Sequence, residues 1–114
     1  MKKYSEIVYK GKTYIYDFNL NVMEQIQSEY GTVAKWGELT DGSSGEPDAK
    51  AIIFGFYCML NEGIEISNEE NVTKDPPLTL KQVGRMISDV GLAEATAKLN
   101  KTVVDSTASE EKNA

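Results

Sequence analysis

Histidine is absent from this chain of 114 residues, and cysteine occurs once, at Cys58. Histidine is the side chain most used for proton transfer near neutral pH, and it is also the commonest metal ligand. A lone cysteine excludes an intramolecular disulfide and a cysteine-rich zinc site. The sequence therefore predicts no metal site and no cofactor, and it indicates a protein that is not an enzyme.

Long apolar runs and a positive charge balance are also missing. No stretch approaches the roughly 18 consecutive apolar residues of a membrane span, and Met1 to Lys3 are not followed by the apolar run of a signal peptide. Twelve Lys and Arg against 18 Asp and Glu give a net charge of −6, which repels phosphate backbones. We therefore expect no membrane and no nucleic-acid partner. Because an unpaired thiol suits a reducing compartment, we expect a cytoplasmic location.

The composition that remains is that of one soluble domain, with 40% hydrophobic and 26% charged residues. We expect residues 1–104 to form this single globular domain. From Asp105 onward the only apolar residues are Ala108 and Ala114. Such a segment cannot repay its ordering entropy, so we predict a disordered tail over 105–114.

Residues 5–18 are rich in β-branched and aromatic side chains and are interrupted by Lys10, Gly11 and Lys12. This pattern predicts a β-hairpin in which Gly11 takes a positive φ. Alternation places Ile7 and Tyr9 on one face of the first strand, and it places Tyr14, Tyr16 and Phe18 on one face of the second. The hairpin tyrosines either form an exposed binding surface or cover the helices, and both alternatives stay open.

Helical spacing begins near Leu20 and continues to Tyr30, with Gly31 as the stop and with Asn21 and Glu24 as a possible capping pair. Residues 32–39 suggest one short helical turn, and 40–47 form a polar surface loop.

The segment 49–60 is apolar at almost every position and predicts a central helix that is buried on all sides. Its expected core residues are Ile52, Ile53, Phe56, Met59 and Leu60. Gly55 would allow a close neighbour, and Gly63 would end the helix before an acidic loop over 64–77. Cys58, in the middle of this helix, is interpreted as a small core hydrophobe, since there is no histidine to activate it as a nucleophile.

Four acidic residues, Glu62, Glu65, Glu69 and Glu70, lie at the start of this expected loop. Carboxylates suit calcium, but the order of an EF-hand loop is missing, so we favour a solvated loop.

A late helix begins at Thr79, where Gln82 completes a capping box and Leu78 faces Val83 as a hydrophobic staple. Its apolar stripe is Val83, Met86, Ile87 and Val90. Gly91 separates it from a last helix with Leu92, Ala95, Leu99 and Val103 at helical spacing. The sequence thus predicts an α+β fold, with an N-terminal β-hairpin packed on a bundle of about four helices.

Several short motifs carry a family resemblance. They are the turn Tyr9-Lys10-Gly11-Lys12-Thr13-Tyr14, then Asp17-Phe18-Asn19, then Glu29-Tyr30-Gly31, and finally Leu78-Thr79-Leu80-Lys81-Gln82-Val83-Gly84. In this order around a central apolar helix, they resemble the tail assembly chaperones of long-tailed bacteriophages and prophages over about residues 5–104. The resemblance implies a non-enzymatic factor that coats the tape measure protein and recruits tail tube subunits.

Other classes stay open: a structural phage subunit such as a head–tail connector or tube component, or a bacterial regulatory binding module. The chaperone interpretation also implies self-association. Its candidate contact residues are Trp36, Tyr57 and Met86, a tryptophan beside a polar loop, a tyrosine with a polar tip on an apolar helix, and an adaptable methionine. Core packing is the alternative for all three.

Overall fold

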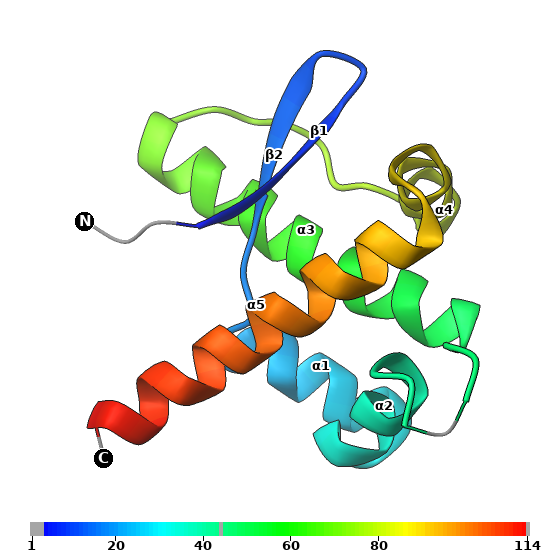
Figure 1. Cartoon of the computed structure of the whole chain (residues 1–114). Coiled ribbons are helices and arrows are strands. Elements are labelled where there is room, and N and C mark those ends of the chain that lie inside the picture. Colours follow the sequence, from blue (N-terminus) through cyan, green and yellow to red (C-terminus); the bar gives the residue numbers. More distant parts are fainter. Residues whose placement is uncertain (1–3, 44, 114) are drawn as a thin grey trace.

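A β-hairpin precedes five helices in the computed structural model, which describes residues 4–43 and 45–113, with side chains as far as residue 106 (Figure 1). The elements are β1 (Ser5–Tyr9), β2 (Lys12–Tyr16), α1 (Leu20–Tyr30), α2 (Val33–Thr40), α3 (Ala49–Asn71), α4 (Leu80–Val90) and α5 (Leu92–Asn113). The predicted α+β class is confirmed. Within the described residues, no helix is both long enough and apolar enough to cross a membrane.

The hairpin turn follows from two residues with positive φ. Lys10 has a φ of 51° and Gly11 a φ of 77°, which is the pattern of the two-residue type I′ turn that matches the twist of antiparallel strands. The turn sets the register, in which Ile7 pairs with Tyr14 and Ser5 pairs with Tyr16. The positive φ predicted for Gly11 is confirmed.

One face of the hairpin covers the helices. Ile7 and Tyr16 are buried, while Tyr9 and Tyr14 are partly buried against the same core. The ring of Tyr16 meets Phe56 of α3 edge to face, with 5.4 Å between ring centroids. Of the two alternatives left open for the hairpin tyrosines, the structure shows the covering role for these three.

Helix α3 is the centre of the molecule, and every other helix and strand β2 pack against it (Figure 1). Ile52, Phe56, Met59 and Leu60 are completely buried, as predicted. Ile53 is only partly buried, which corrects its assignment to the innermost core. The helix is therefore not buried on all sides, since Phe54 and Tyr57 are also only partly buried.

Gly63 does not end α3, contrary to the sequence prediction. The helix continues for two more turns to Asn71, so most of the expected acidic loop is helical. A Cβ atom at Gly63 would collide with the backbone carbonyl of Ile15 in β2. Glycine is present because the hairpin backbone lies against the helix, and the buried side chain of Ile64 continues the apolar stripe beyond it.

Gly55 has the role predicted for it. A Cβ atom there would lie 2.5 Å from Trp36 Cζ2 and 3.1 Å from Leu99 Cδ1. The missing side chain thus allows α2 and α5 to approach the same turn of α3.

The helix starts show which polar residues act as caps. Thr79 and Gln82 form the predicted capping box, with bonds of 3.1 Å and 2.8 Å. For α1 the cap is Asn19, which accepts from Val22 N, rather than the predicted Asn21. Leu20 consequently lies at the first helical position, where it is 72% exposed.

The C-terminal helix passes residue 104, where the sequence predicted that the folded domain ends. Its backbone continues to Asn113, and Lys101 pairs with Asp105 at 2.8 Å across the predicted boundary. Side chains 107–113 and residue 114 lie outside the described part, so disorder of 105–114 stays a prediction.

Candidate functional site

Trp36 lies in the core instead of on a contact surface. It is 1% exposed, its indole Nε1 donates to the Ala51 carbonyl at 3.0 Å, and its ring stacks on Phe18 with centroids 6.1 Å apart. The closeness of a polar loop suggested exposure, but Gly55 provides the space that buries the ring. The structure therefore corrects its assignment as a partner-binding residue.

Met86 is also buried, at 1% exposure, on the face of α4 that carries Val83 and Ile87. The alternative of core packing holds for this residue. Direct contact between Met86 and a partner would require α4 to leave the core.

Tyr57 is the one predicted contact residue that reaches the surface. It is partly buried on α3, and its ring lies beside that of Phe54, with 6.3 Å between the centroids. The Phe54 ring in turn contacts Tyr30 of α1, with centroids 5.8 Å apart. These three rings form an aromatic row that runs from α1 onto the partly buried face of α3. Burial raises the pKa of Tyr30, and its hydroxyl is buried without a hydrogen-bond partner in the described residues.

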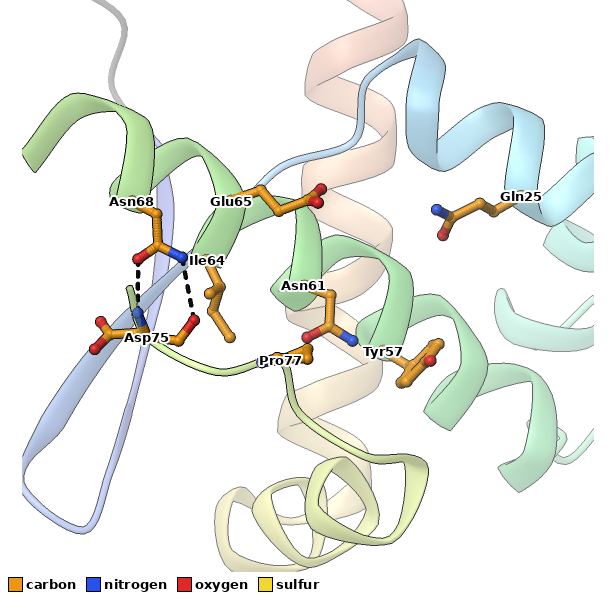
Figure 2. A pocket seen from close by; sticks show the side chains of 8 residues that line it. All are labelled: Gln25, Tyr57, Asn61, Ile64, Glu65, Asn68, Asp75 and Pro77. Carbon is orange, nitrogen blue, oxygen red and sulfur yellow. Dashed lines mark hydrogen bonds between the residues drawn. The ribbon is translucent and has the colours of Figure 1, made fainter. Parts of the chain in front are cut away.

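Tyr57 lines a cleft of about 380 Å³ on α3 (Figure 2). The floor is α3, one wall is α1 at Gln25, and the other wall is the segment that joins α3 to α4. We call residues 72–78 of this connection the strap. The lining residues are Gln25, Tyr57, Asn61, Ile64, Glu65, Asn68, Asp75 and Pro77.

Two asparagines of α3 hold the strap by its backbone. Asn61 donates to the Leu78 carbonyl at 3.1 Å and accepts from Leu78 N at 2.7 Å. Asn68 makes the same pair of bonds with Asp75, at 3.1 Å and 3.0 Å (Figure 2). Each amide thus satisfies both backbone groups of one strap residue.

The spacing of the two clamps explains why they fit. Asn61 and Asn68 are two helical turns apart, about 10.5 Å along the axis. Asp75 and Leu78 are three residues apart with Pro76 and Pro77 between them, and three residues of an extended, polyproline-II-like segment span about 9 Å. Neither asparagine is among the site residues predicted from the sequence. Their separation of seven residues and the two prolines were the available signals.

A second depression of about 350 Å³ adjoins the cleft and shares Glu65 and Asn68 with it. Its rim is acidic, because Glu62, Glu65 and Glu69 lie on one side of α3. Glu62 accepts from Asn19 Nδ2 at 2.6 Å and Asn21 Nδ2 at 3.0 Å, which ties α1 to α3. The predicted acidic cluster is thus on a helix and not in a loop. Among the described residues, no group of three or more potential ligands could hold a metal ion.

Cys58 lies near Glu29 and Tyr30 of α1 and is 2% exposed. Burial raises its pKa to about 12, so the thiol is neutral at physiological pH. A neutral buried thiol is a poor nucleophile, in agreement with its interpretation as a small core hydrophobe.

Comparison of the chain with protein-family models, with curated proteins and with solved structures gives no match. What the site can do therefore rests on its own chemistry. A shallow, open cleft with an aromatic end and a carboxylate rim suits the side chains of another polypeptide.

Proposed function

We propose that the chain is a non-enzymatic tail assembly chaperone of a long-tailed phage or prophage, which holds helical segments of the tape measure protein and recruits the tail tube protein. The observation that supports the binding role is the cleft on α3, which lies between α1 and the strap. There the central helix meets solvent along a stripe of mixed aromatic and acidic character. The family assignment is supported by the motif resemblance.

The cleft favours a client of particular chemistry. Tyr57 and Ile64 offer an apolar contact at the floor, whereas Glu65 and Glu69 are exposed at the rim. An amphipathic helix with an apolar stripe flanked by Lys or Arg complements this arrangement. The net charge of −6 would keep a complex with an apolar client soluble.

Co-expression with a tape measure protein tests the proposal. We expect the wild-type chain to keep the client soluble and to co-purify with it. Replacing Glu65 and Glu69 by Lys should reduce this rescue at least about tenfold, because the rim would repel a basic helix. Glu46→Lys, a charge reversal in the exposed loop before α3, is the matched control and should retain the rescue.

Two results would count against the proposal. A client that is equally insoluble with and without the wild-type chain would overturn the chaperone function. Rescue that the double charge reversal and Glu46→Lys retain equally would show that the cleft is not the client site.

A further inference from the structure

The two ends of the strap are held with unequal strength. At the Leu78 end, the Asn61 bonds are partly buried, the Leu78 side chain packs against the core, and Thr79 starts the capping box of α4. At the Asp75 end, Asn68 bonds the Asp75 backbone twice and accepts from the Thr73 hydroxyl at 2.8 Å, but all three bonds are exposed. The ion pair of Asp75 with Lys12 is 3.6 Å long between half-exposed side chains. Exposed polar contacts of this kind are weak in water.

The strap leaves α3 through a residue, Val72, whose backbone conformation is unfavourable. Val72, the C-cap of α3, has φ 53° and ψ 48°, the left-handed region, and is 91% exposed. A β-branched residue is rarely found there because its side chain crowds the backbone. The backbone N–H groups of Val72 and Thr73 both donate to the Asn68 carbonyl, the latter at 3.1 Å, and hold this conformation. Opening that extends back to Thr73 would let Val72 relax, so the closed strap includes a cost that the open strap does not.

We propose that the strap is a hinged lid on α3, which opens locally at Asp75 while Leu78 and α4 stay in place. Residues 71–77 are themselves all exposed, so opening gives up little buried surface of the strap, and its main cost is the exposure of Ile64. It removes the Asp75 and Pro77 wall of the cleft and uncovers Ile64, which is 8% exposed in the closed form.

Opening that extends to Thr73, whose hydroxyl donates to the same amide oxygen, also frees the Asn68 amide. Its oxygen and nitrogen would then present to solvent the donor and acceptor pair that the Asp75 backbone occupies in the closed form. The cleft already extends from Tyr57 to Asn68 in the closed form. Opening widens it and leaves at its Asn68 end an amide that can pair with extended backbone. The lid therefore controls how much of α3 a bound polypeptide can contact.

Amide hydrogen exchange measured by NMR tests the lid, because Asp75 N and Leu78 N each donate to one clamp. We expect the Asp75 amide to be protected at least about tenfold less than the Leu78 amide. Asn68→Ala should raise the exchange rate at Asp75 by about fivefold or more and leave the rate at Leu78 unchanged. Asn100→Ala, which removes a comparable side-chain bond to the Thr40 carbonyl away from the strap, is the control and should change neither.

A second variant tests the hinge from the other direction. Val72→Asn places a residue that tolerates the left-handed region at the C-cap, so it should slow exchange at Asp75. Equal protection of Asp75 and Leu78 in the wild type, or equal acceleration of both by Asn68→Ala, would overturn the lid. The experiment contains no client, so its outcome is independent of the proposed chaperone function.

Discussion

Two glycines of α3, Gly55 and Gly63, lie where other elements press against the helix. At Gly63 the neighbour is the backbone of Ile15, which cannot move without the whole hairpin. At Gly55 the nearest neighbours are side-chain atoms of Trp36 and Leu99. Each glycine lowers the intrinsic stability of the helix through its conformational entropy, and each allows a neighbouring element to pack closely.

Gly63→Ala should destabilise the fold by about 1–3 kcal/mol, the usual range for overpacking a core. The free energy of unfolding from urea titration measures the loss. Gly37→Ala in α2 is the matched control, since a Cβ atom there meets nothing within 4 Å. It should be neutral or stabilise the fold by up to about 1 kcal/mol through helix propensity. Equal effects of the two substitutions would contradict the packing role of Gly63.

Cys58 should make stability depend on pH above 9. Its pKa is about 12 in the fold, where burial disfavours the thiolate, against an ordinary value of 9.0. At a pH between these two pKa values, the thiol is protonated in the folded state and ionised in the unfolded state, so unfolding releases a proton. The contribution of Cys58 to the free energy of unfolding is therefore complete below pH 9 and falls as the pH rises.

Urea titrations at pH 7.5 and pH 9.5 measure this effect. Both pH values lie below 10.0, the ordinary pKa of tyrosine, above which ionisation of Tyr16 and Tyr30 would dominate the pH dependence. The wild type should lose more stability between the two pH values than Cys58→Ala does. An equal loss in both proteins would show that the thiol is not responsible.

Single residues could be interpreted from the sequence when their neighbours in the chain decided their role. Cys58 lies within an apolar run, and its burial followed from that run alone. Trp36 is different, because its environment is created by Gly55, nineteen positions away. Gly63 was misinterpreted for the same reason, since β2, which packs where a Gly63 side chain would lie, is far earlier in the chain.

Among the elements, α4 is the one whose start depends most clearly on local chemistry. Thr79 and Gln82 bond reciprocally to each other's backbone N–H groups, and Leu78 packs against the core beside them. A capping box of this type satisfies two donors that the first helical turn leaves free.

Thr79→Ala should lower the free energy of unfolding by about 0.5–2 kcal/mol, the usual cost of losing an N-cap. Thr79→Ser keeps the hydroxyl and should retain most of the stability. Thermal denaturation followed by circular dichroism compares the three proteins. An alanine variant as stable as the serine variant would contradict the role of the cap.

Element boundaries were predictable where caps set them and not where packing did. The start of α4 and the end of α1 at Gly31 match the sequence prediction. The length of α3 does not, because two further turns are stabilised by contact with β2 and by the strap. The candidate cleft could not be predicted for a related reason: its walls come from α1 and the strap, which only the fold brings together.

At the scale of the whole molecule, the described part of the chain contains only two strands. A two-stranded sheet has outer edges at which another strand can pair. Val8, on the outer face of β1, is 60% exposed. These features favour weak self-association through β1, whereas the net charge of −6 opposes it by mutual repulsion.

The balance of these two effects predicts self-association that increases with salt. Because salt screens repulsion between exposed charges, sedimentation velocity at about 100 µM protein should show more dimer at high ionic strength than at low. Val8→Lys should reduce the dimer at both, since a charged side chain on an edge strand disfavours pairing. Leu20→Lys, at an equally exposed apolar position on α1, adds the same charge away from the hairpin and should reduce it less. A strict monomer under all conditions would contradict self-association, and equal effects of the two lysine variants would place the contact elsewhere than β1.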